Sequence, residues 1–477
     1  MVFSSHLFLF YFLPLALAVS LLSPRRMWLG VLAVFSYLFY GWANPAFMLL
    51  MMVSTVIDYL CGLVLLREGN RRVRNLIECR TFTEKAALWT SIVANLSLLG
   101  FFKYFNFAAE NYRALTGHFG WAQPDFFLEV TLPLGISFYT FQSMSYTIDI
   151  YRGEARALRN FAGFAAYVSM FPQLVAGPIV RFQTVARQLR RPDRSWEAFA
   201  RGVACFSLGL GKKVLIANPC GKVADTLFGA TDAGVLESWL GMFAYSFQIY
   251  FDFSGYSDMA IGLGLMLGFR FPINFDSPYR AKSITDFWQR WHISLSTWLR
   301  DYLYVPLGGN RHGLPRTYAN LFIVMFLGGL WHGASWNFVI WGSAHGLLLA
   351  AERALPGRSL WSGLPAFLQT ALSFTVVSLL WVLFRAEDLP GALQYYGRLF
   401  GLLPGGELSG LVAGLVWKPL FVIAMVAAAA LVWIGPTTLV WTQRLTAPKA
   451  VWSLAVFWAA ALMLSVQKFN PFIYFIF

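Results

Sequence analysis

Charged residues are scarce in this sequence. Only 13% of its 477 residues are Asp, Glu, Lys or Arg, whereas these residues make up about 25% of an ordinary soluble domain. Hydrophobic residues account for 58% of the chain. A soluble fold would have to expose much of this apolar surface to water, so the composition excludes a soluble protein and indicates an integral membrane protein.

Cysteine is also scarce, and none of the four cysteines has a close partner in the sequence. Cys61, Cys79, Cys205 and Cys220 show no C-x-x-C spacing, which argues against both a disulfide framework and a thiolate metal site. The histidines likewise lack the H-x-x-x-H and H-x-x-E spacings of zinc sites. We therefore predict no metal and no bound cofactor.

Long uncharged runs recur along the chain. A membrane-spanning helix needs about 20 mostly apolar residues, and the sequence offers roughly ten to thirteen such segments, complete or interrupted. We predict an all-α, polytopic membrane protein that forms a single domain over residues 1–477. No basic leader or small-residue cleavage site accompanies the first run, so we expect a retained helix and not a signal peptide. The main uncharged runs are Met1–Pro24, Met27–Ile57, Phe161–Val180, Thr317–Ala351, Ser359–Phe384, Pro419–Gln443 and Ala450–Gln467.

The basic residues lie mainly in short loops between these runs. The net charge of +14 therefore fits the positive-inside rule and contact with anionic lipid, and we predict no nucleic-acid partner. Arg25 and Arg26 follow the first helix, and further basic residues lie between Arg67 and Lys85. We expect both loops in the cytoplasm and the N-terminus on the opposite, outer side of the membrane.

One apolar stretch conflicts with this alternation. Phe161–Val180 lies between two basic loops, Arg152–Arg159 and Arg181–Arg201, and a complete crossing would place one of them outside. The stretch contains Phe171-Pro172 and Gly177-Pro178, which break helices. We interpret it as a re-entrant or broken segment that lines a buried polar site; the alternative is a kinked spanning helix.

His332 is the clearest candidate for chemistry. It lies near the middle of Thr317–Ala351, the longest uncharged run, between glycines and beside Trp331, Trp336 and Asn337. Ionisable residues inside apolar runs are costly and mark functional sites by default. A lone helix histidine is more often a core residue, but the depth and the flanking glycines favour a functional one.

His292 is the second candidate, in a segment rich in tryptophan. Ser283 and Asp286 have the spacing of a capping box, and Asp286 with Arg290 has that of an i,i+4 ion pair. We predict one amphipathic helix that begins here and carries His292 on its apolar face. A helix lying in the lipid headgroups would have the same pattern.

A polar cluster, Asp252-Phe-Ser-Gly-Tyr-Ser-Asp258, separates the apolar segments Ser238–Phe251 and Met259–Phe269. We interpret it as a helix interruption. Asp252 and Asp258 could orient a histidine, hold a water molecule, or only satisfy the broken backbone.

Four stretches resemble the membrane-bound O-acyltransferase family, in particular its bacterial alginate O-acetyltransferase branch. They are distinctive together, and the similarity extends from Met1 to the last third of the chain. The stretches are Phe171-Pro-Gln-Leu-Val-Ala-Gly-Pro-Ile-Val-Arg181, Asp252-Phe-Ser-Gly-Tyr-Ser-Asp-Met-Ala260, Phe287–Gly309 and Gly329-Leu-Trp-His-Gly-Ala-Ser-Trp-Asn337.

The resemblance implies helices around a central tunnel, a cytoplasmic acyl donor and an acceptor reached from the opposite side. The family's membrane histidine falls on His332. His292 stands where many members carry Asn, which leaves its role less defined. For this branch the donor would be an acetyl thioester such as acetyl-CoA. The acetyl group would serve exopolysaccharide O-acetylation at the bacterial inner membrane, with periplasmic partner proteins.

The residues suggest a mechanism of their own. Alcoholysis of a thioester needs a base near neutral pH, and imidazole is suited to it. We expect His332 to deprotonate the acceptor hydroxyl, and His292, Asn337 or a backbone N–H to stabilise the oxyanion. An acetyl-histidine intermediate is an alternative. Candidate contacts for the phosphates of CoA are Arg181, Arg280 and Lys282, although lipid anchoring explains these three equally well.

Two other classes of protein fit parts of this pattern. A polysaccharide or lipid-linked sugar transporter would also use broken helices and polar groups within the membrane, although no inverted repeat is visible. A non-catalytic scaffold of a polysaccharide synthase would leave His332 dispensable. Cleavage of labelled acetyl-CoA by the purified protein separates these alternatives from an enzyme.

Overall fold

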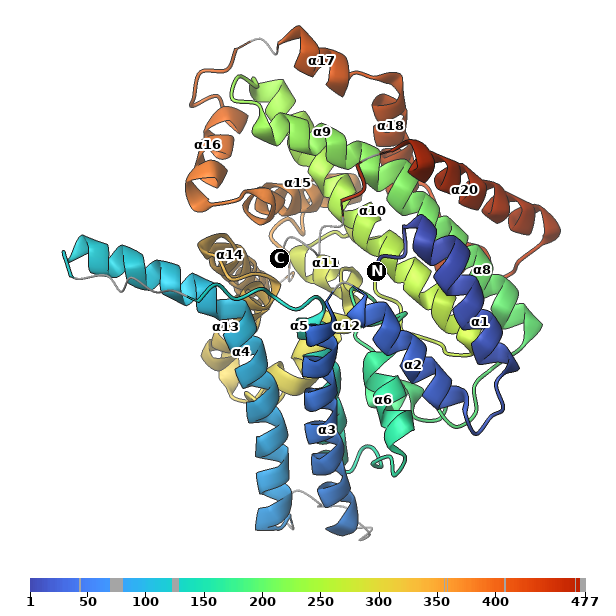
Figure 1. Ribbon diagram of the computed structural model, residues 1–477. Coiled ribbons are helices and arrows are strands. Elements are labelled where there is room, and N and C mark those ends of the chain that lie inside the picture. Colours follow the sequence, from blue (N-terminus) through green and yellow to red (C-terminus); the bar gives the residue numbers. More distant parts are fainter. Residues whose placement is uncertain are drawn as a thin grey trace. The chain divides into compact units, whose positions relative to one another are not determined.

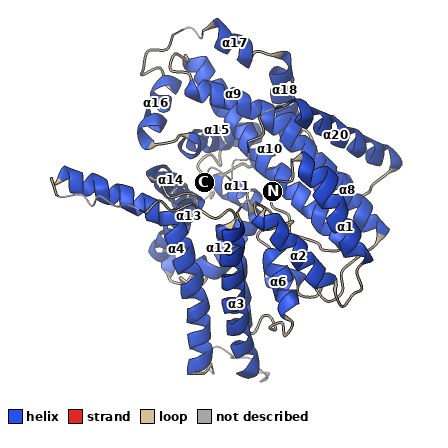
Figure 2. Ribbon diagram, in the orientation of Figure 1, coloured by secondary structure: helices blue, strands red, loops and turns tan. Residues whose placement is uncertain are grey.

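The computed structural model describes residues 1–42, 44–68, 80–121, 128–355, 357, 359–406, 409–467 and 469–471. Every regular element in these ranges is a helix, as Figure 2 shows. This confirms the predicted all-α class. Residues 69–79 of the basic loop between Arg67 and Lys85 lie outside the described ranges.

The described residues form two compact units. The first contains Met1–Phe199 and Leu263–Pro272, and the second contains Ala200–Gly262 and Ile273–Phe477. The single-domain organisation stays a prediction. The helices that begin in the first unit are η1 (Phe8–Phe12), α1 (Leu13–Leu22), α2 (Trp28–Gly41), α3 (Pro45–Glu68), α4 (Phe82–His118), α5 (Ile136–Arg152), α6 (Phe161–Ser169), α7 (Phe182–Val185) and α8 (Trp196–Gly211).

The helices of the second unit follow in chain order. They are η2 (Lys212–Ala217), α9 (Asn218–Gly229), α10 (Val235–Leu267, whose last residues belong to the first unit), η3 (Pro278–Arg280), α11 (Ile284–Arg290), α12 (Ile293–Leu299), η4 (Arg300–Tyr304), α13 (Gly313–His332), α14 (Trp336–Ala354), α15 (Ala366–Arg385), α16 (Leu389–Leu399), α17 (Gly410–Val416), α18 (Pro419–Trp433), α19 (Thr438–Thr442) and α20 (Ala447–Val466).

Several helices have the length and composition of membrane spans. Among the described residues, four helices are long and apolar enough to cross a bilayer: α3 over Pro45–Leu66, α4, α15 and α20. Shorter apolar helices cover Phe8–Leu22, Trp28–Gly41 and Pro419–Trp433. The chain is thus a multi-pass membrane protein, while the full count of roughly ten to thirteen segments stays a prediction.

Within the first unit, α3 and α4 lie side by side (Figure 1) and share a buried polar cluster with α5. Both oxygens of Asp58 accept hydrogen bonds from the Asn95 amide at 2.9 Å, and Ser91 donates to one of them at 2.6 Å. Ser91 also contacts the hydroxyl of Thr147 at 2.9 Å. Polar groups inside an apolar bundle are stable only when they are paired in this way, so the cluster fixes how the three helices pack.

The segment Phe161–Val180 is broken, as its prolines predict. Helix α6 ends at Ser169, and residues 170–180 are irregular and entirely buried. The N–H of Phe171 donates to the Ser36 hydroxyl of α2 at 3.1 Å, and the Gln173 amide donates to the Tyr167 carbonyl at 2.6 Å. Irregular backbone is tolerated at membrane depth when protein groups satisfy it, which these contacts do.

Candidate functional site

His332 is the last residue of α13. The chain turns at Gly333, and α14 returns alongside α13 (Figure 1). The imidazole is 5% exposed. Its ring centroid lies 5.0 Å from that of Trp331, 5.2 Å from Trp341 and 5.3 Å from Phe384. The ring of His332, at the end of the helix, is thus surrounded by aromatic side chains on several sides.

Two glycines set the spacing of the α13–α14 hairpin. A Cβ atom on Gly342 would lie 2.4 Å from the carbonyl oxygen of Met325 and 2.9 Å from the Cα of Gly329. A Cβ on Gly329 would lie 2.3 Å from the carbonyl oxygen of Phe338. Only glycine permits this approach of two backbones. The crossing therefore fixes the distance between His332 on α13 and Trp341 on α14.

His292 lies at a sharp bend between α11 and α12. Its backbone has φ 44° and ψ 52°, a left-handed conformation that is rare for a residue other than glycine, and its side chain is completely buried. Such a conformation costs about 1–3 kcal/mol and persists only where the surroundings impose it. The prediction of one continuous helix through His292 was therefore wrong: the chain bends at Trp291 and His292, and two short helices result.

The local signals at the start of this segment are confirmed. The Ser283 hydroxyl accepts from the N–H of Asp286 at 3.0 Å, and Arg290 pairs with Asp286 at 2.6 Å. A further acceptor comes from α14, where the buried carboxylate of Glu352 accepts from the N–H groups of Ile284 and Thr285 at 2.9 and 2.8 Å. A carboxylate at a helix N-terminus is favourable, so Glu352 anchors α11 against α14.

The two histidines face one cluster of aromatic rings. Their ring centroids are 6.3 Å apart, and the His292 ring lies 4.7 Å from Phe253 and 6.0 Å from Trp331. The Nδ1 of His292 is 3.1 Å from the side-chain oxygen of Asn274. Two imidazoles at this separation can act on one small substrate group.

Two adjoining cavities lead to His332. The smaller, of about 130 Å³, is lined by His332, Trp341, Gly328 and a set of apolar side chains. The larger, of about 660 Å³, shares five lining residues with it. These shared residues are Trp288, Ser296, Val324, Met325 and Leu349. The larger cavity thus adjoins a smaller one that reaches the imidazole.

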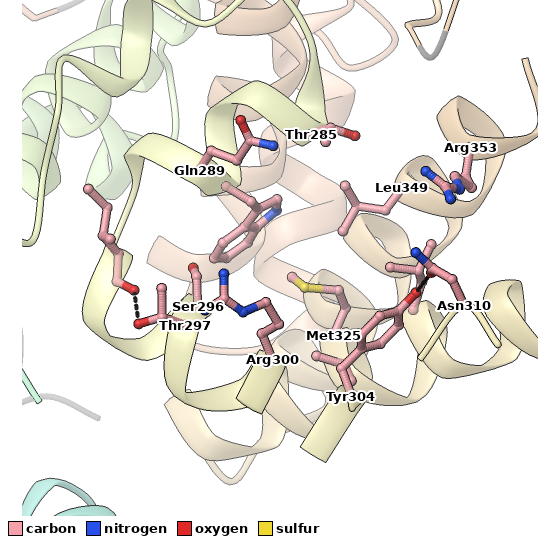
Figure 3. A pocket seen from close by; sticks show the side chains of 14 residues that line it. Thr285, Gln289, Ser296, Thr297, Arg300, Tyr304, Asn310, Met325, Leu349 and Arg353 are labelled. Atoms are coloured by element: carbon pink, nitrogen blue, oxygen red, sulfur yellow. Dashed lines mark hydrogen bonds between the residues drawn. The ribbon is translucent and has the colours of Figure 1, made fainter. Parts of the chain in front are cut away.

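Two arginines line the larger cavity. Figure 3 shows Arg300 of η4 and Arg353 of α14 at different walls, with polar side chains that include Thr285, Gln289 and Asn310. Arg300 pairs with the neighbouring Asp301 at 2.6 Å. Arg353 has no ion-pair partner in the described part of the chain. The arrangement suits a ligand with an anionic end in the larger cavity and a small apolar end near His332.

Comparison with known proteins identifies the family. The family model of membrane-bound O-acyltransferases matches residues 47–384, which is more than half of the chain. The chain belongs to this family.

Relatives agree over most or all of the length. A probable alginate O-acetylase of Azotobacter vinelandii is 42% identical, and the similarity covers all of both chains. The probable alginate O-acetylase of Pseudomonas aeruginosa is 45% identical over 89% of this chain and 81% of its own. A peptidoglycan O-acetyltransferase of Helicobacter pylori is 37% identical over 84% and 80%. The protein is therefore an O-acyltransferase, and we do not retain the transporter or the scaffold.

In this O-acyltransferase, the polar cluster around Asp252 and Asp258 does not interrupt a helix as we predicted. Helix α10 continues without interruption from Val235 to Leu267, so the prediction of a helix break was wrong. Each carboxylate has a lysine partner on η2 instead. Lys213 lies 2.8 Å from Asp252, and Lys212 lies 2.7 Å from Asp258. The ion pairs compensate these buried charges, so the carboxylates are not needed to satisfy a broken backbone, one of the three roles that the sequence left open for them.

The remaining predicted residues lie in different places. The Asn337 amide donates to the carbonyl of Ala386 at 2.9 Å, and Trp336 is 55% exposed. Arg280 donates to the carbonyls of Val432 and Gly435 at 2.7 and 2.5 Å. Lys282 is exposed and does not line the larger cavity. Arg181 belongs to the other unit.

Sequence reasoning missed several residues of this region. His345 is fully buried, and its Nδ1 accepts from the Trp288 indole at 3.2 Å. Its ring meets that of Trp341 edge-to-face at 4.9 Å, and Trp341 also contacts His332. The turn at Gly333 lets both histidines, which lie on different helices, contact the same tryptophan. Of the cavity arginines, Arg300 lies within the family stretch Phe287–Gly309, whereas Arg353, in the last turn of α14, lies outside all four stretches.

Proposed function

We propose that the protein transfers an acetyl group from acetyl-CoA to hydroxyl groups of an exopolysaccharide of the alginate type, directly or through a periplasmic partner. The observation that carries this proposal is the pair of adjoining cavities, the smaller of which is lined by His332, with His292 beside it. In this proposal the protein lies in the bacterial inner membrane with its N-terminus in the periplasm.

The cavity supports a donor with this chemistry. In this proposal Arg353 and Arg300, which line the larger cavity, bind the phosphates of CoA, because guanidinium groups bind phosphate with two parallel hydrogen bonds. The inner cavity of about 130 Å³ matches a short acyl group better than a fatty chain. These arginines replace Arg280 as our proposed phosphate contacts, since Arg280 is occupied by backbone carbonyls.

The chemistry needs a base and a site that excludes water. In the proposed step, His332 takes the proton of the acceptor hydroxyl, whose oxygen attacks the acetyl carbonyl. The C–S bond breaks, and the thiolate of CoA takes up the proton to leave as the free thiol. Positioned base catalysis of this kind contributes roughly 10²–10⁴-fold. The aromatic rings around His332 exclude water that would hydrolyse the thioester.

The names of the relatives support a cell-envelope polymer as the acceptor. Proteins similar to this one over most of their length are described as acetylating alginate or peptidoglycan. Both acceptors carry sugar hydroxyls outside the cytoplasm, whereas acetyl-CoA is a cytoplasmic metabolite. A membrane enzyme that receives its donor from one side and its acceptor from the other would meet this requirement.

The test uses purified protein in proteoliposomes with radiolabelled acetyl-CoA and an alginate-type oligosaccharide. We expect release of free thiol together with label on the sugar, or retained on the protein when no acceptor is present. Label that stays on CoA under every condition, with binding of the donor intact, would refute the acetyl transfer. Equally efficient transfer of label from a longer acyl-CoA would refute the proposal that the transferred group is acetyl.

A further inference from the structure

Asn274 is the centre of a hydrogen-bond network that holds the bend at His292. It is 1% exposed and lies between α10 and η3. Its side-chain oxygen accepts from the N–H of Ser294 at 3.3 Å and from the Ser294 hydroxyl at 2.9 Å. Its backbone carbonyl accepts from the N–H of Ile293 at 2.9 Å. The same side-chain oxygen lies 3.1 Å from Nδ1 of His292.

The orientation of the Asn274 amide follows from these partners. A backbone N–H can only donate, so the atom that faces Ser294 must be the oxygen. The amide nitrogen then points to the hydroxyl of Ser257 on α10, at 3.0 Å. The reversed orientation would place two donors against each other at Ser294.

This orientation decides which nitrogen of His292 carries the proton. An amide oxygen only accepts hydrogen bonds, so the Nδ1 that faces it must be the donor. A neutral imidazole has one N–H, which leaves Nε2 with a lone pair. Nε2 is buried and has no hydrogen-bond partner in the described part of the chain. A second residue that selects the tautomer of a histidine in this way is a recurrent device of active sites.

We infer that Asn274 is a positioning residue that holds His292 in its Nδ1–H tautomer, which leaves Nε2 as a proton acceptor on a ring 6.3 Å from that of His332. The inference rests on the proposed function for its catalytic meaning. It changes the role that we assigned to His292 from sequence. A neutral imidazole in this tautomer cannot donate from Nε2 to an oxyanion. Its Nε2 can instead accept the hydrogen bond of an acceptor hydroxyl, which orients that hydroxyl beside His332.

The direct test is the tautomer itself. Solid-state nuclear magnetic resonance of the full-length protein in lipid, with ¹⁵N-labelled histidine, distinguishes protonated from unprotonated Nδ1 and Nε2. Only six histidines are present, and His292→Ala identifies the signal by its loss. We expect a protonated Nδ1 and an unprotonated Nε2. A protonated Nε2 with a bare Nδ1 would overturn the inference.

Substitutions at Asn274 separate positioning from folding. Asn274→Asp retains an acceptor oxygen, so we expect the same tautomer and substantial activity. Asn274→Leu removes it, and we expect a changed His292 signal and a turnover at least about tenfold lower with unchanged affinity for acetyl-CoA. The matched control is Asn320→Leu, because the partners of that buried amide among the described residues are the carbonyls of Leu307 and Gly309; we expect it to leave the His292 signal unchanged.

The outcomes distinguish the two proposals. If Asn274→Leu fails to fold, the tautomer in the unsubstituted protein and in Asn274→Asp still decides the inference. A leucine variant with an unchanged His292 signal or with normal turnover would refute the positioning role. If the unsubstituted protein transfers no acetyl group, the proposed function fails, whereas the tautomer can still be measured and judged.

Discussion

Replacing Gly342 by alanine tests whether the close α13–α14 crossing sets the position of His332. The added Cβ would lie 2.4 Å from the Met325 carbonyl oxygen and 2.9 Å from the Cα of Gly329. Carbon and oxygen atoms in such contacts normally stay about 3.3–3.6 Å apart. Both obstructing atoms belong to the backbone, so the two helices must separate by about 1 Å to relieve the clash.

The effect should appear in both stability and turnover. Overpacking of this kind costs about 1–3 kcal/mol. Because Trp341 precedes the substituted residue and contacts the His332 ring at 5.2 Å, the separation also moves the imidazole from its aromatic neighbours. A misplacement of about 1 Å can lower a catalytic rate about a hundredfold. We therefore expect Gly342→Ala to lower the temperature of unfolding and to reduce acetyl transfer by roughly ten- to a hundredfold.

Gly100→Ala is the matched control. Gly100 lies within α4, and a Cβ added there would meet no atom within 4 Å. Alanine in a helix interior is more favourable than glycine by about 1 kcal/mol, so this variant should be as stable as the unsubstituted protein or more so. The assay heats detergent-solubilised protein and measures the folded fraction by size-exclusion fluorescence, alongside acetyl transfer per folded molecule. If Gly342→Ala matches Gly100→Ala in both measurements, the crossing does not position the site.

Three further predictions concern charge. Asp252→Asn should lower the free energy of unfolding by about 3–5 kcal/mol, because the pair with Lys213 is almost fully buried. The double variant Lys213→Met/Asp252→Leu should regain the resistance to heat, and undiminished stability of Asp252→Asn would contradict this. Arg353→Gln should raise the KM for acetyl-CoA about tenfold, the value of one charge-assisted hydrogen bond, with kcat unchanged. Arg316→Gln, outside the cavity, should leave the KM as it was, and an equal effect of both variants would remove Arg353 from the donor site. In a cysteine-free background, Arg190→Cys should react with an impermeant thiol reagent only after lysis, and labelling in intact cells would disprove its cytoplasmic position.

Local sequence signals predicted much of the structure. The prolines in Phe161–Val180 predicted the break that follows Ser169, and Ser283 with Asp286 predicted where α11 begins. The composition alone indicated the helical membrane fold. The break and the helix start depend on residues only a few positions apart, so they can be predicted from a single sequence without homologues.

The geometry of the site depends on contacts between distant residues, and these could not be predicted. The left-handed bend at His292 is hydrogen-bonded to Asn274, which precedes it in an irregular stretch with no periodic pattern. Lysines on η2 neutralise the carboxylates of α10 across a tertiary contact. The hairpin turn at Gly333 brings Trp341 of α14, which also contacts His345, to His332 of α13. In each case the deciding partner lies on another element.

The central claim is that His332 is the base of the transfer reaction, and His332→Ala tests it most directly. The residue ends α13, where alanine is a good helix former, so the variant should insert into the membrane and bind acetyl-CoA normally. The measurement is the rate of acetyl transfer from radiolabelled acetyl-CoA to the polysaccharide, per folded molecule. We predict a loss of at least about a hundredfold. Near-normal transfer by His332→Ala, in cells and with purified protein, would contradict the account.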